Sequence, residues 1–153
     1  MKHKLLVAVD GEKTSWKTAI YVGRACASAK SPFCEVVVYH VLPEFPSYAA
    51  QERVTPELLE SFESETRMAG KILLAEMKAR IAREGVKPEL ITTELSKARG
   101  SVAAQILATA RAHHCDTIVL GRRGKSMIGQ FFMGSVVEKI LRNPTGLTTW
   151  VVE

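Results

Sequence analysis

Short, nearly continuous apolar runs alternate with longer amphipathic segments along the 153 residues of this chain. Runs of Val, Ile and Leu with few polar residues are typical of strands buried on both faces, as in a parallel sheet. They predict strands at 4–9, 35–42, within 86–95, at 117–120 and at 147–152. Segments of helical periodicity separate them, so the expected order is βαβαβαβαβ. This order favours an α/β fold with three αβα layers and an open, mainly parallel five-stranded sheet.

Each of the expected helices has a recognisable start or stop. The first is expected to be capped by Thr14 or Ser15, because hydroxyl side chains bond the free N–H groups of a first turn. The third is expected at 102–113. The fourth is expected at 135–142, where the Asn-Pro pair that follows it stops the helix.

The second helix is expected to be the longest. Thr55 is its cap, Pro56 occupies its first position, and the helix runs to about Glu84 before Gly85 closes it. Its first half is acidic and its end basic, which suits the helix dipole. Apolar residues at helical spacing predict one core stripe along its whole length: Leu58, Leu59, Phe62, Ala69, Ile72, Leu73, Met77 and Ile81.

Composition narrows the class of protein. With 46% hydrophobic and 24% charged residues, the chain is expected to form one globular domain, 1–153. No apolar run approaches the roughly 20 residues that span a bilayer. The apolar run near the N-terminus is too short for a signal peptide, so a cytoplasmic protein is expected. The net charge of +5 comes from scattered cations, without aromatic residues interleaved, which makes nucleic-acid binding a minor alternative.

The spacing of the cysteines matches no metal-binding or disulfide motif. Cys26, Cys34 and Cys115 are odd in number, widely spaced and without a C-x-x-C pair. Buried reduced thiols are therefore expected instead of a disulfide framework.

The segment with the clearest chemistry links the fourth strand to the fourth helix. It reads Gly121-Arg122-Arg123-Gly124, then nine residues to Gly134-Ser135, and it contains four glycines, three cations and no acid. Glycines let backbone N–H groups approach an anion, and a helix N-terminus adds further donors. Strand, glycine loop and helix together predict a phosphate cradle, although a plain surface connection remains the alternative. Three-layer α/β sheets bind ligands at the carboxyl ends of their strands, so Asp10, Val41 and Gly121 are expected to converge on one crevice.

Better-known phosphate motifs do not fit this segment. A Walker A loop ending at Gly124-Lys125-Ser126 would need glycine at position 119, which is Val119 in the predicted strand. The dinucleotide G-x-G-x-x-G pattern is absent after the first strand, where only Gly11 follows Asp10. A zinc site at His113-His114-Cys115 is disfavoured because adjacent residues do not easily share one tetrahedral ion.

The spacing Gly121-x-x-Gly124, nine residues, Gly134-Ser135 resembles the ATP-binding signature of the universal stress protein family. Val7 to Gly11 is similar to the first strand and turn of that family, and Tyr39 to Val41 to the end of its second strand. The resemblance covers nearly the whole chain. It implies a Rossmann-like sheet of the adenine nucleotide alpha hydrolase type and a single universal stress protein domain. One departure is Glu12, where serine is common in the family.

The resemblance also implies which residues contact a nucleotide. Asp10 and its neighbours would hold adenosine, Val41 would present its backbone to adenine, and the glycine loop would wrap a triphosphate. Structural roles without a ligand remain the alternatives. Asp10 would then form a turn or cap a helix, Val41 would belong to the core, and Arg122 and Arg123 would be solvated. The implied set is Ala8, Val9, Asp10, Val41, Gly121, Arg122, Arg123, Gly124, Lys125, Ser126, Met127, Gly134, Ser135, Val136 and Val137.

We therefore expect a cytoplasmic, ATP-binding stress-response regulatory protein that forms a homodimer through its C-terminal strand. ATP, or AMP or ADP, would bind with Mg²⁺ or Mn²⁺. The glycine loop has no Asp, Glu or His that could act as a general base, so at most slow hydrolysis or autophosphorylation is expected. Two alternatives remain: a dimeric interaction module whose pocket is empty or holds AMP, and a small ATP-dependent enzyme.

Overall fold

Five parallel strands form one sheet in the order β3-β2-β1-β4-β5. The computed structural model describes residues 3–28, 34–46, 54–122, 134–143 and 146–153. The strands are β1 (His3–Ala8), β2 (Cys34–Leu42), β3 (Ile91–Lys97), β4 (Thr117–Gly121) and β5 (Thr148–Val152). The fold expected from the apolar runs is confirmed.

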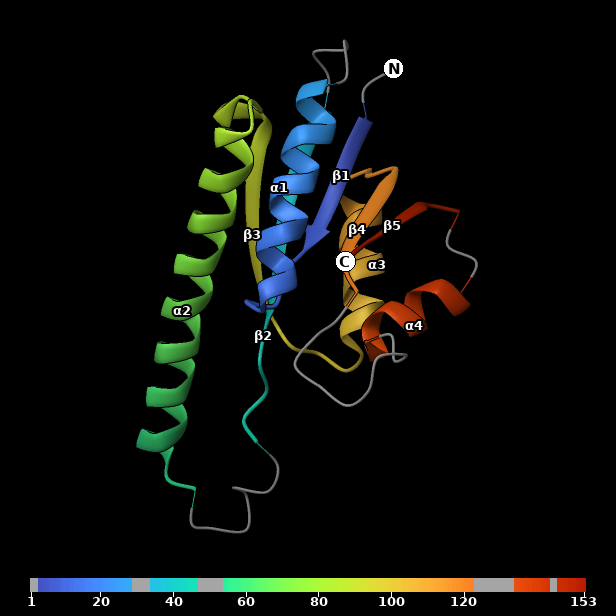
Figure 1. Ribbon diagram of the computed structural model, residues 1–153. Coiled ribbons are helices and arrows are strands. Elements are labelled where there is room, and N and C mark those ends of the chain that lie inside the picture. Colours follow the sequence, from blue (N-terminus) through green and yellow to red (C-terminus); the bar gives the residue numbers. More distant parts are fainter. Residues whose placement is uncertain (1–2, 29–33, 47–53, 123–133, 144–145) are drawn as a thin grey trace.

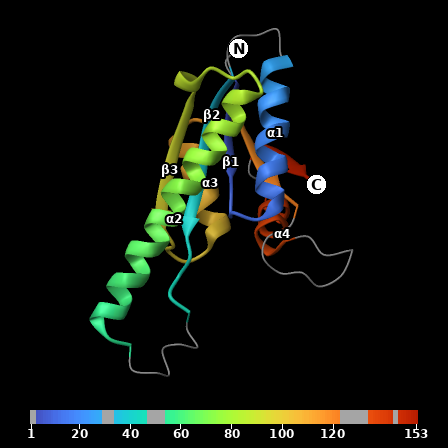
Figure 2. The same ribbon diagram turned by 60° about the vertical axis from the view of Figure 1, so that its left-hand side comes forward.

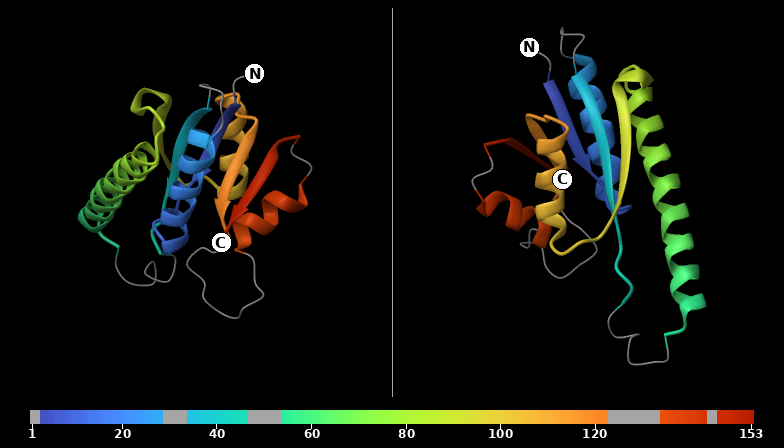
Figure 3. Two further views of the ribbon diagram at one scale, coloured as in Figure 1. Left: turned by 45° about the horizontal axis from the view of Figure 1, so that its top comes forward. Right: turned by 180° about the vertical axis from the view of Figure 1, so that it is seen from behind.

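Helices cover both faces of the sheet (Figures 1 and 3). The helices α1 (Lys13–Ser28) and α2 (Pro56–Arg83) pack on one face, while α3 (Val102–Ala112) and α4 (Ser135–Arg142) pack on the other. Among the described residues, no helix is both long enough and apolar enough to cross a membrane.

The core lies in two layers, one on each side of the sheet. Successive side chains of a strand point to opposite faces. Leu5 and Val7 of β1 therefore pack under α1 and α2, while Leu6 between them packs under α3 and α4. This arrangement explains why β1, β2 and β4, which lie inside the sheet, read as apolar runs, whereas the edge strand β3 carries several polar residues.

Most boundaries lie within one residue of the expectations, but the first helix and the third strand, which also continues to Lys97, differ more. The first helix begins at Lys13, so Thr14 and Ser15 lie inside its first turn and neither is its cap. The third strand begins at Ile91 because a 3₁₀ turn, Pro88–Leu90, occupies the start of the predicted segment. Proline fixes φ and removes a ladder donor, which suits a turn better than a strand.

The long helix α2 docks along only half of its length. Its expected start is confirmed, since the Oγ1 atom of Thr55 accepts a hydrogen bond from the Leu58 amide. Its buried residues, however, are Gly70, Leu74, Met77 and Ile81. The core stripe was wrong for Leu58, Leu59, Ala69 and Ile72, which are exposed. The first half of α2 extends past the end of the sheet, so it has no sheet surface to pack against (Figure 2).

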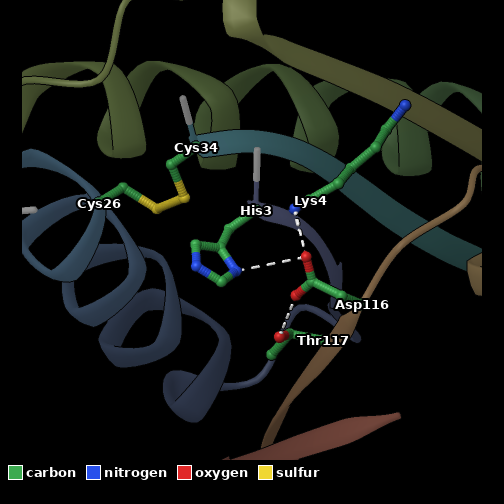
Figure 4. The surroundings of a disulfide bond; sticks show 6 residues. All are labelled: His3, Lys4, Cys26, Cys34, Asp116 and Thr117. Atoms are coloured by element: carbon green, nitrogen blue, oxygen red, sulfur yellow. Dashed lines mark hydrogen bonds and ion pairs between the residues drawn. A yellow bond between two sulfur atoms is a disulfide. The ribbon is translucent and has the colours of Figure 1, made fainter. Parts of the chain in front are cut away.

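Two of the three cysteines form a disulfide bond, which corrects the expectation of reduced thiols. Cys26 in α1 and Cys34 at the start of β2 are bonded, with their Cα atoms 5.7 Å apart (Figure 4). They meet because the end of α1 lies beside the start of β2, a tertiary relation that cysteine spacing does not encode. Cys115 is a buried free thiol, as expected.

Candidate functional site

The candidate site lies at the carboxyl edge of the sheet, between β1 and β4. The chain builds outward from β1 through β2 to β3, and from β4 to β5 on the other side, so the strand order reverses here. Ala8 is in register with Tyr39 of β2 and with Leu120 of β4. The predicted positions Val9, Asp10 and Gly121 therefore follow or end strands at one edge. Such a reversal point is where open α/β sheets bind ligands.

Asp10 stands in the turn between β1 and α1, where glycine is required at the next position. Gly11 has φ of +85°, a conformation that side chains disfavour. Asp10 Oδ1 accepts hydrogen bonds from the Glu12 amide at 3.0 Å and from the Ser15 hydroxyl at 2.9 Å. Asp10 thus forms the turn, which is one of the roles that the sequence left open for it. Its Oδ2 atom receives no hydrogen bond from the described residues, so one carboxylate oxygen is still available to a ligand.

Val41 presents its backbone to the same edge. In a parallel strand, alternate residues direct both backbone groups to the same neighbour. Tyr39 accepts the amide of Val9 at 2.9 Å, so Val41, two residues later, also faces the β1 side. The β1 strand pairs with β2 only as far as Tyr39. The N–H and C=O groups of Val41 consequently point into the space beyond the end of β1, while its side chain packs against the core.

His40 is a site neighbour that sequence reasoning missed. Its Nδ1 lies 2.7 Å from the carbonyl oxygen of Val9, a hydrogen bond that fixes how the chain leaves β1. A lone histidine at a strand end has no sequence partner that would reveal this role.

The N-terminus of α4 supplies backbone donors that have no acceptor among the described residues. Gly134 is its N-cap and has no side chain to bond the first turn. The first intrahelical bond runs from the Glu138 amide to the Gly134 carbonyl. The amides of Ser135, Val136 and Val137 precede it and have no acceptor inside the helix. Ser135 is exposed at this end.

Hydrogen bonds bring this helix start to the end of β4. The Gly134 amide donates to the Arg122 carbonyl at 3.1 Å, and the Arg122 amide donates to the Val152 carbonyl of β5 at 2.7 Å. The two ends of the glycine loop therefore meet at the sheet edge. Within the loop, Arg123, Gly124, Lys125, Ser126 and Met127 lie outside the described residues.

Two predicted residues have structural partners that the sequence did not suggest. The Arg122 guanidinium pairs with Glu153 at the end of the chain. A Cβ atom on Gly121 would lie 2.9 Å from the Thr14 side chain, so glycine here lets the first turn of α1 pack onto β4. Close packing of α1 against β4 thus requires glycine at this position.

Comparisons with known proteins identify the family and the fold of this chain. The model of the universal stress protein family matches residues 1–146. The universal stress protein YxiE of Bacillus subtilis is 30% identical over 144 residues, which span 92% of each chain. Among solved structures, the protein MJ0577 aligns with a TM-score of 0.77 at 22% identity, covering 99% of this chain and 96% of its own. A universal stress protein of Archaeoglobus fulgidus in complex with dAMP aligns with a TM-score of 0.65 at 17% identity, covering 99% and 98%.

Proposed function

Because the chain belongs to the universal stress protein family, we propose that it is a regulatory protein that binds ATP, or AMP or ADP, at the carboxyl edge of its sheet. The adenine base is supported by the Archaeoglobus fulgidus neighbour, which is described in complex with dAMP. We propose that the protein acts in the cytoplasm as one domain, 1–153.

The observation that carries this proposal is the backbone of Val41, directed past the end of β1. Adenine offers an acceptor at N1 and a donor at its amino group on one edge. An N–H beside a C=O is complementary to that edge. The half-free carboxylate of Asp10 is suited to accept hydrogen bonds from ribose hydroxyls, and Ala8 and Val9 complete the wall on this side.

The phosphates would lie at the start of α4. The amides of Ser135, Val136 and Val137, the Ser135 hydroxyl and the helix dipole all favour an anion at this position. Gly134 leaves room for it. We propose that Gly121 to Met127 close over the phosphates, on the strength of the glycine and cation pattern.

We propose that Mg²⁺ or Mn²⁺ arrives with the nucleotide. The described residues contain no group of three or more His, Cys, Asp or Glu side chains suited to a metal ion. A magnesium ion on a nucleotide needs only one or two carboxylates besides phosphate oxygens and water. Glu12 is the carboxylate of this turn that the ribose would not use, and a single carboxylate fits that requirement. We propose at most slow hydrolysis or autophosphorylation, because the glycine loop lacks a general base.

We further propose that two copies pair through β5. This strand is an edge of the sheet, so one side of its backbone is free for pairing. Its side chains Trp150, Val151 and Val152 are half-buried, as in a strand that has room for a partner.

Titration calorimetry of nucleotide-free protein tests the proposal. We expect one ATP per chain, and binding at least about tenfold weaker for GTP, because guanine reverses the donor and acceptor on the edge that faces Val41. Mass spectrometry of gently purified protein should find an adenine nucleotide. Equal affinity for ATP and GTP would contradict the role of Val41, and absence of any nucleotide binding would favour the interaction module.

A further inference from the structure

The outer face of α2 carries a second stripe of exposed side chains, mostly apolar, that the core does not bury. Its members alternate three and four residues apart: the apolar Leu58, Met68, Ile72, Ala75 and Ala79, and the polar Ser61 and Glu65, whose side chains are hydrogen-bonded to each other. Leu58 is 49% exposed, Met68 63% and Ile72 55%, high values for large apolar side chains. A repeat of three and four residues is the spacing of a coiled-coil seam.

This stripe lies opposite the face that α2 buries. Gly70, Leu74, Met77 and Ile81 point into the core. At about 100° per residue, Ile72 is turned by roughly 160–200° from each of Gly70 and Leu74. The sheet and α1 therefore do not cover the stripe. Figure 2 shows that one half of α2 extends beyond the sheet while the other half is docked, and the stripe residues lie in both halves.

The charges of α2 identify the partner that would fit. The first half of the helix, 56–69, contains four glutamates and one arginine, and the second half, 70–83, contains four cations and one glutamate. A second α2 running parallel would place like charges together. An antiparallel one would place each acidic half beside a basic half. The charges of α2 therefore complement those of a second α2 only when the two helices are antiparallel.

We infer that α2 is a contact surface for a second copy of this chain, packed antiparallel about a two-fold axis near Met68. In this arrangement Met68 faces Met68 of the partner subunit, Leu58 faces Ala79 of the partner subunit, and Glu57 faces Lys78 of the partner subunit. The axis follows from the midpoint of the stripe. The inference is independent of nucleotide binding and of pairing through β5, because α2 packs on β2 and β3 and not on the β5 edge.

Cysteine cross-linking of the full chain tests this register. Cys26 and Cys34 are bonded to each other and Cys115 is buried, so an introduced surface cysteine is the reactive thiol. Met68→Cys should give a covalent dimer under mild oxidation. In a preformed pair the thiols meet at millimolar effective concentration, so at about 10 μM protein the cross-link should form about a hundredfold faster than by random collision. Leu141→Cys, at a similarly exposed apolar position on α4, is the matched control.

Further variants fix the direction of the pair. Leu58→Cys alone should not cross-link faster than the control, whereas a mixture of Leu58→Cys and Ala79→Cys proteins should give the mixed dimer. Self-cross-linking of Leu58→Cys as fast as Met68→Cys would indicate a parallel pair and overturn the inference. A Met68→Cys rate equal to that of Leu141→Cys would overturn the contact itself. In sedimentation, Glu57→Lys and Lys78→Glu should each weaken the α2-dependent association, and the double variant should restore it.

Discussion

The two ends of the parallel strands, which form the amino edge and the carboxyl edge of the sheet, use their polar groups in opposite ways. At the amino edge, Asp116 joins the starts of three strands: its carboxylate accepts from the Lys4 amide, its amide donates to the Lys4 carbonyl, and its carbonyl accepts from the Thr148 amide. Thr117 and His3 add contacts to the same carboxylate, beside the disulfide (Figure 4). At the carboxyl edge, Val41, Asp10 Oδ2 and the start of α4 direct polar groups outward, and within the described residues these groups have no such partners.

This difference indicates that one sheet can place the groups that stabilise it at one edge and the groups available for binding at the other. Polar groups that are paired with each other hold strands together, and polar groups that face solvent at a strand reversal remain available to a ligand. Changes at the carboxyl edge should therefore alter nucleotide affinity with little effect on unfolding, and changes at the amino edge should do the reverse.

Gly134→Val should produce the largest effect. Gly134 has φ of −57° and ψ of 144°, a conformation that valine adopts readily, so the fold should persist. The isopropyl group would occupy the space in front of the α4 amides and remove two or more phosphate hydrogen bonds. We expect ATP to bind about a hundredfold more weakly in calorimetry. An unchanged affinity with an unchanged melting temperature would contradict the phosphate position.

Reducing the disulfide near the amino edge should lower stability without touching the site. The bond closes a loop between residues separated by eight positions. Its removal in the Cys26→Ser, Cys34→Ser variant should cost about 2–3 kcal/mol of unfolding free energy, by the loop-entropy estimate. Urea unfolding measures this cost, and ATP calorimetry on the same variant should give the wild-type affinity.

Asp10→Asn should weaken ATP binding about tenfold, because an amide is a poorer acceptor than a carboxylate for ribose hydroxyls. Asp10 also shapes the turn, so the matched control is Ser15→Ala. That variant removes the hydrogen bond to Oδ1 but keeps the carboxylate. It should cost about 1 kcal/mol of stability and leave the affinity unchanged. If Ser15→Ala loses affinity as much as Asp10→Asn does, Asp10 acts only through the turn.

The smallest effect concerns Cys115, just before Asp116. Burial raises the pKa of its thiol from 9.0 to about 11. A raised folded-state pKa stabilises the protein below the unfolded value, and this stabilisation is lost as the pH rises from about 9 through 11. Compared with Cys115→Ser, the wild-type protein should therefore lose stability more steeply over that range in urea titrations. Parallel pH curves for the two proteins would contradict it.

The sequence predicted elements best where apolar pattern and punctuation agree. The fourth helix was predicted at 135–142 and lies at Ser135–Arg142. Its prediction succeeded because Gly134 marks its start, Asn-Pro marks its end, and its apolar residues lie on one face. Along α2, however, apolar spacing alone does not tell which residues reach the sheet, so Leu58 and Ile72 were assigned to a core that they do not enter. The disulfide escaped prediction for the same reason, since it depends on where α1 ends and where β2 begins.

Some features of the candidate site could likewise be predicted from the sequence, and others could not. The convergence of the strand ends followed from the alternation of strands and helices, a property of the pattern. The outward direction of the Val41 backbone depends on where β1 stops pairing with β2, which requires the register. The partners of Arg122 and Gly121, namely Glu153 and Thr14, come from contacts between distant segments. Sequence spacing carries no signal for such contacts.

Amide NMR of the uniformly labelled chain, titrated with ATP, tests the central claim most directly. If adenine bonds the backbone beyond the end of β1, the Val41 amide should shift and exchange more slowly with solvent, together with the amides of Ser135, Val136 and Val137. The Lys4 and Asp116 amides at the amino edge should not change. Saturating ATP that leaves the Val41 amide unaffected, or that shifts the amino edge instead, would contradict the account.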